Sequence, residues 1–139
     1  YEISSRDWSS DVCSSDLVAR WQPLLPPVAL EVPNVSGELR TVTVDYQALF
    51  TVDGQAVRLL PMAVDDREVF FVFRDRSSGR ETYGAGRFLK AQPAVDGSIT
   101  LDFNRAFNPP CAFTAFATCP LPPPENWLPF AVPAGERKP

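Results

Sequence analysis

The chain contains no histidine. This removes the commonest general base, the commonest metal ligand and every Ser–His or Cys–His nucleophile pair. Acid–base chemistry would then rest on carboxylates with help from tyrosine or arginine. The candidates for such a role are Asp75, Asp102, Glu125, Tyr83 and Arg87. Together they define one hypothesis, a histidine-free enzyme in which two carboxylates act as acid and base.

A second hypothesis is a structural or small-ligand-binding module. Arg74 and Asp75 precede a short loop that holds two serines, and Arg87 follows it. Arginine binds phosphate and carboxylate groups in a bidentate manner, so this loop is a candidate anion site. The competing interpretation is a hairpin in which arginine and aspartate pair across neighbouring strands.

Oxygen-bearing side chains recur between residues 102 and 126. Asp102, Asn104 and Asn108 resemble ligands of a hard cation, but the spacing lacks the central glycine and the final carboxylate of an EF-hand loop. Such side chains more often bond neighbouring backbone groups in turns. Glu125 and Asn126 follow three prolines and are expected to anchor the end of the loop. The sequence therefore predicts no metal and no cofactor.

Cys111 and Cys119 are the two cysteines that remain once the N-terminal segment is set aside. A disulfide between them would stabilise the fold by about 2–3 kcal/mol on the chain-entropy model. The alternative is two reduced, buried thiols, which is expected in a cytosolic protein, whereas the disulfide is expected in an exported one. A thiol-redox role is a third hypothesis, although redox pairs normally lie two residues apart at a helix start. Zinc would need further ligands.

Residues 1–17 are rich in serine and aspartate and have no usable periodicity, which is typical of disorder. Residues 7–17, DWSSDVCSSDL, resemble a translated sequencing adapter. We expect a non-native peptide over 1–17, followed by a single domain over 18–139. Much of the formal net charge of −4 lies in that peptide. The near-neutral remainder gives no electrostatic case for nucleic acid.

No apolar run is long enough to span a membrane, and no signal peptide is visible, so a cytoplasmic location is the default expectation. A native leader would be missing if the chain is truncated.

Alternating apolar residues and Asp-Gly pairs predict a mainly β fold. The strongest signal is a hairpin around Asp53 and Gly54. We expect an antiparallel meander that forms a sandwich or small barrel, and no amphipathic helix of ten residues or more. The expected strands are 28–32 at a sheet edge, 39–44, 48–52, 55–60, 68–74, 82–90, 98–103 and 127–132.

The segment 102–126 is too rich in proline for a regular element and too apolar for a disordered linker. Long irregular loops in compact domains usually have a function or cover a core. We therefore expect a Pro/Cys-rich loop that caps the sheet.

Several blocks of the sequence form a distinctive set: Arg74 and Asp75, Ser78 and Gly79, and the ranges 82–89, 101–112, 119–128 and 134–136. Together they resemble a bacterial family known as domain of unknown function 1684. Family members look longer on the N-terminal side, so the resemblance implies a C-terminal fragment. It implies no known activity, cofactor, partner or catalytic residue. A structural or small-ligand-binding module is the reading we adopt, with the histidine-free enzyme as the alternative.

Overall fold

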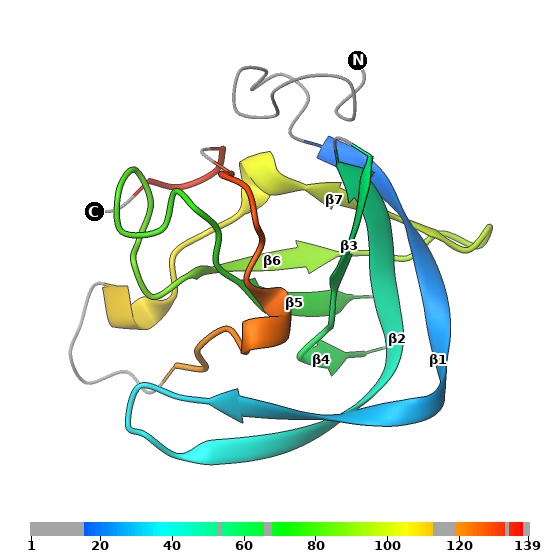
Figure 1. Ribbon diagram of the computed structural model, residues 1–139, viewed down its shortest axis with the longest axis horizontal. Helices are drawn as coiled ribbons and strands as arrows, with labels where there is room; N and C mark the ends of the chain where they lie inside the picture. The colour runs from blue at the N-terminus through cyan, green and yellow to red at the C-terminus, as the bar shows by residue number, and fades with distance from the viewer. Residues whose placement is uncertain (1–15, 53, 66–67, 113–118, 133, 138–139) are drawn as a thin grey trace.

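The computed structural model describes residues 16–52, 54–65, 68–112, 119–132 and 134–137. These residues form seven strands: β1 (Asp16–Pro33), β2 (Leu39–Val52), β3 (Gln55–Leu59), β4 (Ala63–Val64), β5 (Val69–Phe73), β6 (Arg87–Ala91) and β7 (Ser98–Asp102). The strands make a curled four-stranded sheet, ordered β3-β2-β1-β7, and a three-stranded sheet, ordered β4-β5-β6 (Figure 1). All pairings between these strands are antiparallel, which confirms the mainly β prediction.

Three short 3-10 turns follow the strands: η3 (Phe103–Arg105), η4 (Pro110–Ala112) and η5 (Pro124–Asn126). In the part of the chain that the structure describes there is no α-helix, and no helix that is long and apolar enough to cross a membrane.

Strand β1 is 18 residues long and lies between β2 and β7. Strand β7 pairs only with residues 16–20 of β1, whereas residues 28–32 pair with β2 alone. The predicted edge strand over 28–32 is therefore one end of a longer strand, and Pro26 and Pro27 fall where the β1–β2 register shifts, between Pro23 and Val28. Asp16 and Leu17, assigned to the disordered peptide, are part of β1 and pair with Asp102 and Leu101 of β7.

Strand β2 is also longer than predicted, because 39–44 and 48–52 are one continuous strand. The intervening residues remain paired to β1, with Tyr46 opposite Pro23 and Gln47 opposite Gln22. The β2–β3 hairpin matches the prediction, since Val52 pairs with Gln55 and Gly54 has a φ of 79°. Asp53 itself lies outside the described residues.

Two strand predictions are corrected in the C-terminal half. Strand β6 begins at Arg87 and not at residue 82, because residues 77–86 form successive turns closed by bonds such as Gly86 N–H to the Tyr83 carbonyl. Residues 127–132 do not form a strand. They make one bridge, between Trp127 and Arg74, because Pro129 cannot donate to a ladder.

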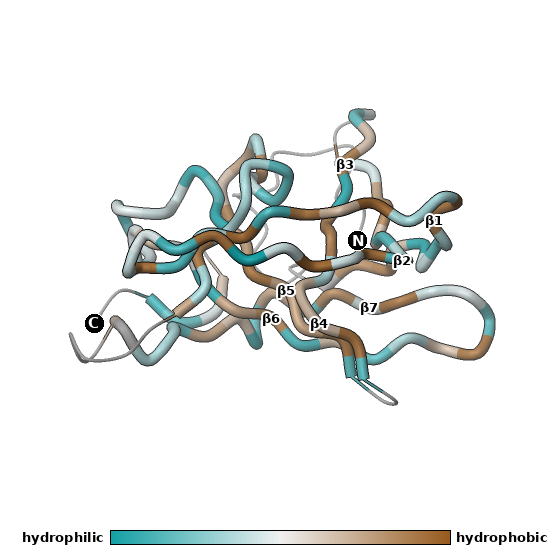
Figure 2. Tube along the Cα trace, turned by 90° about the horizontal axis from the view of Figure 1, so that it is seen from below, coloured by the Kyte–Doolittle hydropathy of each residue, from teal (hydrophilic) through white to brown (hydrophobic). Residues whose placement is uncertain are grey.

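The main core lies between the two sheets. It includes fully buried side chains from both, among them Leu59, Phe71, Leu89 and Leu101. Phe73 of β5 packs against Phe103 of η3 with ring centroids 5.4 Å apart, so the described start of the 102–126 loop contributes to the core. Hydrophobic residues gather in the central strands and hydrophilic ones in many peripheral loops (Figure 2).

Strands β6 and β7 are joined by a short turn but belong to different sheets. In this turn, the Asp96 carboxylate accepts bonds from the backbone N–H and the hydroxyl of Ser98, at 3.0 and 2.7 Å. These bonds lower the pKa of Asp96 below its ordinary value of 3.8. The connecting turn bridges to β7 at Pro93 and Ile99, and β6 and β7 themselves do not pair, so each is the last strand of its own sheet. That separation creates the groove described below.

Candidate functional site

Asp75 and Arg87 form a buried ion pair between the end of β5 and the start of β6. Arg87 Nη2 lies 3.2 Å from Asp75 Oδ2, and neither side chain is exposed to solvent. The guanidinium carbon is 5.3 Å from the Phe73 ring centroid, so the charge lies against an aromatic face. The pair of the sequence analysis is therefore an interior contact and not a surface anion site.

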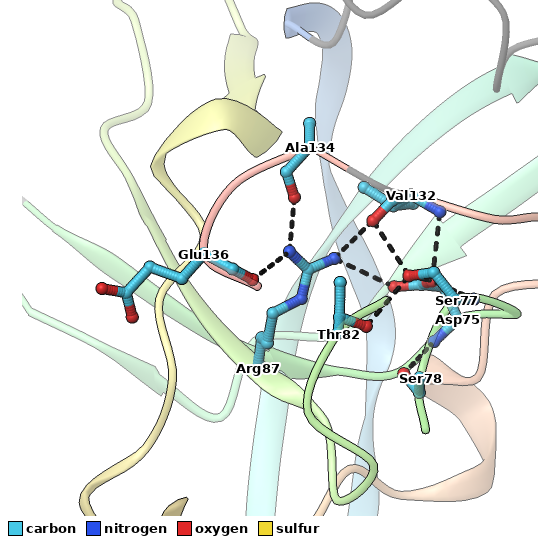
Figure 3. Close-up of polar contacts among 8 residues, drawn as sticks. All are labelled: Asp75, Ser77, Ser78, Thr82, Arg87, Val132, Ala134 and Glu136. Carbon is cyan, nitrogen blue, oxygen red and sulfur yellow. Dashed lines mark hydrogen bonds and ion pairs between the residues drawn. The ribbon is translucent and has the colours of Figure 1, made fainter. Parts of the chain in front are cut away.

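Both Nη atoms of Arg87 donate to carbonyls of the C-terminal segment (Figure 3). Nη2 donates to the Val132 carbonyl at 2.6 Å, while Nη1 donates to the carbonyls of Ala134 and, at 3.3 Å, Glu136. Burial lowers the pKa of Arg87, and Asp75 offsets part of this effect. Nε is buried without a partner among the described residues. One guanidinium thus fastens residues 132–136 to the sheet.

The Asp75 carboxylate also accepts several hydrogen bonds from other protein groups. Its Oδ1 accepts bonds from the Ser77 N–H at 2.7 Å, the Val132 N–H at 3.0 Å and the Ser77 hydroxyl. Thr82 Oγ1 lies 2.9 Å from the same hydroxyl, and Ser78 Oγ accepts from Asp75 N–H at 3.1 Å. The Asp75 side chain has no solvent-exposed surface, and every partner named here belongs to the protein.

Asn126 of η5 fastens the end of the irregular loop. Its Oδ1 accepts from the Leu60 N–H at 2.9 Å, and its Nδ2 donates to the carbonyls of Leu60 and Val72 at 2.8 and 2.9 Å. The side chain is buried. Asn126 therefore links Leu60, which follows β3, to Val72 of β5. The strands β3 and β5 belong to different sheets and do not pair with each other.

The other polar candidates of the loop also bond backbone groups. Asp102 Oδ1 accepts from the Asn104 N–H at 3.1 Å and caps η3, while Asn104 is itself exposed. Asn108 is buried; its Nδ2 donates to the Arg137 carbonyl at 2.9 Å, and its backbone N–H donates to the Glu136 carboxylate at 2.7 Å.

The three candidate carboxylates do not converge. Asp75 is buried, Asp102 lines a groove beside β6, and Glu125 lines a separate hollow on the β1–β2 hairpin. Tyr83 is half-buried in the turns before β6 and lines none of these hollows. The acid–base set proposed from sequence is thus spread over three places.

The groove between β6 and β7 has a volume of about 470 Å³. It brings together charges of both signs that sequence reasoning missed, apart from Asp102. In the sequence, these charged residues are marked only by being polar and near the ends of the predicted strands. Its lining consists of Glu68, Lys90, Ala91, Gln92, Thr100, Asp102, Arg105 and Phe107.

Arg74 lies on another surface, stacked on Trp127. Its guanidinium carbon is 4.8 Å from the indole centroid, and Trp127 is 53% exposed. Both residues line a smaller hollow of about 280 Å³ beside the proline-rich loop. Arg74 and Arg87 are therefore not parts of one site, contrary to the anion-loop hypothesis.

Cys119 is buried beside Val72 and Phe88 as a free cysteine, which favours the buried-thiol alternative over a disulfide. The side chain of Cys111 lies outside the described residues, so the pairing and redox hypotheses stay predictions. Within the described ranges, no group of three or more Cys, Asp or Glu side chains is placed to hold a metal ion.

Gly86 allows the proline-rich loop to approach β5. A Cβ at this position would lie 2.7 Å from the Phe73 carbonyl oxygen and 2.8 Å from Pro122 Cγ, and the φ is +103°. We expect Gly86→Ala to reduce the free energy of unfolding by roughly 2–4 kcal/mol, through strain and crowding together.

Gly97→Ala is the matched control for this prediction, because Gly97 has a φ of +87° but open space around its Cα. It should show only the backbone strain and therefore a smaller loss in urea unfolding. Equal losses in the two variants would contradict the crowding argument.

The comparisons with known proteins agree with this architecture. The solution structure of an uncharacterized protein from gene locus rrnAC0354 of Haloarcula marismortui is similar, with a TM-score of 0.69 and 34% sequence identity over 88% of this chain and 70% of that one. No curated protein has a sequence that matches significantly. A family described as "Protein of unknown function (DUF1684)" matches residues 14–137. The match spans nearly the whole chain, and the protein therefore belongs to the DUF1684 family.

Proposed function

We propose that the protein is a small-ligand-binding β module and that its ligand occupies the groove between β6 and β7. The observation that carries this proposal is the separation of two neighbouring edge strands, which leaves a groove of about 470 Å³ lined by charges of both signs. This volume falls within the range of small-molecule sites in proteins. Asp75, Arg87 and Asn126 do not line this groove.

The lining fits a small zwitterion. Lys90 and Arg105 provide cations for a carboxylate, while Glu68 and Asp102 provide anions for an ammonium group. Lys90 Nζ lies 3.9 Å from Glu68 Oε1, and the two side chains are 52% and 43% exposed. Such an exposed pair contributes little to stability and exchanges partners at small cost. Lys90 Nζ also lies 5.9 Å from the centroid of Phe107, which gives the groove an aromatic wall.

The histidine-free enzyme is the weaker reading. The groove does hold two carboxylates, Glu68 and Asp102, near Arg105. However, Glu68 faces Lys90, and Asp102 already accepts a backbone N–H. Asp75 and Glu125, the other proposed acid–base groups, lie elsewhere. These partners favour binding over proton transfer.

Titration with zwitterionic amino acids tests the proposal. We expect amide shifts in two-dimensional NMR that are confined to residues around the groove. Acetylated amino-acid amides, which carry neither charge, should bind at least about tenfold more weakly. Lys90→Met and Asp102→Asn should each weaken the binding, because each removes one charged contact.

Arg58→Met is the control variant, since Arg58 is exposed on β3 and does not line the groove. It should leave the affinity unchanged. Equal affinity for the charged and uncharged ligands, or shifts away from the groove, would overturn the proposal.

We also infer that the peptide before the domain is foreign to it. The family match begins at residue 14 and β1 at Asp16, which supports this division and moves its boundary a few residues toward the N-terminus. Deleting residues 1–13 should leave the urea midpoint of unfolding unchanged.

A further inference from the structure

We propose that the hollow around Arg74 and Trp127 binds a carboxylate attached to a small apolar group, such as an aromatic ring. The site is distinct from the β6–β7 groove and shares no lining residue with it. It has a volume of about 280 Å³, and its lining is largely apolar: Pro33, Arg74, Ala85, Leu121, Pro122 and Trp127.

The aromatic wall is held in place by the backbone. Trp127 Nε1–H donates to the Pro122 carbonyl at 3.0 Å, which fixes the orientation of the indole. Two segments of the chain carry the site, and two backbone hydrogen bonds join them. Arg74 N–H donates to the Asn126 carbonyl at 3.2 Å, and Leu128 N–H donates to the Arg74 carbonyl at 2.8 Å. Asn126 in turn is anchored to Leu60 and Val72. A ligand therefore meets a preformed surface, which reduces the entropy lost on binding.

Arg74 supplies the charge. Among the described residues no acidic side chain pairs with it, since the ion pairs there are Asp75–Arg87 and Glu68–Lys90. Its guanidinium stacks on the exposed Trp127 ring, and stacking leaves the N–H donors at the guanidinium edge available. This arrangement differs from that of Arg87, whose Nη donors are used internally. A carboxylate can accept two parallel bonds from such an edge.

The surroundings favour a singly charged anion. Pro33 also lines the neighbouring hollow, which contains the carboxylates of Glu31 and Glu125. These negative charges would repel a phosphate dianion more strongly than a monocarboxylate. The proline and leucine walls offer apolar contact, and this suits a ring or a short aliphatic chain better than a hydrated ion.

The test follows the indole N–H signal of Trp127 by two-dimensional NMR, assigned with Trp127→Phe. We expect 3-phenylpropionate to shift this signal in a saturable manner. 3-Phenylpropionamide, which has the same shape without the charge, should bind at least about tenfold more weakly. Binding by inorganic phosphate with equal affinity would overturn the carboxylate assignment, as would equal binding of the amide.

Arg74→Met should abolish the response to 3-phenylpropionate, and Arg74→Lys should retain only part of it. Arg76→Met is the matched control, because Arg76 is exposed two residues away and lies outside the hollow. Unchanged strand amides in each variant show that the fold is intact. A response that survives Arg74→Met would overturn the proposal.

Two sources share this chemistry, a free small carboxylate and the C-terminal carboxylate of a peptide. A tetrapeptide that ends in phenylalanine, compared with its amidated form, distinguishes them. Tighter binding of the free-acid peptide than of 3-phenylpropionate assigns the site to chain ends, and the reverse order assigns it to small molecules. Failure of this site leaves the β6–β7 proposal untouched, because the variants and ligands differ.

Discussion

Asp75→Ala is expected to lower the free energy of unfolding by about 3–5 kcal/mol, because it leaves a buried arginine without its counter-charge. Arg87 has no exposed side-chain surface, and its other partners are neutral carbonyls. Arg87→Met should cost a similar amount, since it strands Asp75 and frees the carbonyls of residues 132 and 134. Urea unfolding followed by circular dichroism measures both losses.

The double variant Asp75→Ala with Arg87→Met should be less destabilised than the sum of the two single variants. Removing both charges avoids burying either one alone, and such replacements are often tolerated. Arg76→Met, on the exposed neighbour of Asp75, is the control and should change stability by no more than about 0.5 kcal/mol. If both single variants lose less than about 1 kcal/mol of unfolding free energy, the ion pair contributes little to stability.

Asn126→Ala is expected to reduce the free energy of unfolding by roughly 3–5 kcal/mol. The substitution removes three buried hydrogen bonds and leaves the Leu60 N–H and the carbonyls of Leu60 and Val72 without their partner. Each stranded buried group costs about 1–3 kcal/mol. Thermal and urea unfolding measure this loss.

Asn126→Asp separates hydrogen bonding from shape. The carboxylate can still accept from Leu60 N–H, but it would place a second oxygen against two carbonyl oxygens. We expect it to be about as destabilising as alanine. Asn104→Ala is the control, because the Asn104 side chain is exposed and only its backbone N–H is bonded. Wild-type stability of Asn126→Asp would refute the bridging role.

Local patterns predicted the strands well and their lengths poorly. Alternation and the Asp-Gly turn located β2, β3, β5 and β7, because these signals act over neighbouring residues. Strands β1 and β2 are 18 and 14 residues long, and their continuity depends on pairing with each other through residues 20–33 and 39–49. Such a long hairpin tolerates prolines and polar residues that would end an isolated strand, so propensity underestimates it.

The sequence singles out the polar candidate residues by type, but it does not say which of them meet in the fold. Asp75 and Arg87 lie 12 positions apart and their shared partners lie about 45 positions further on. Lys90 and Asp102 reach the same groove only because β6 and β7 are the last strands of different sheets and do not pair. Neither arrangement has a local pattern, because both depend on tertiary packing.

The position of β1 between β2 and β7 affects how the protein folds during synthesis. Strand β1 closes its sheet against β7, which follows it only after five other strands, and among the described residues Arg87 bonds the carbonyls of Val132, Ala134 and Glu136. Contacts so distant in sequence slow folding, since the connecting chain must lose its freedom before they form. During synthesis, β1 therefore lacks its β7 partner, and Arg87 lacks these carbonyl partners, until the later segments have been made. Until then the unpaired strand edge and the apolar faces stay open to non-native contacts for longer than in a domain built from local contacts.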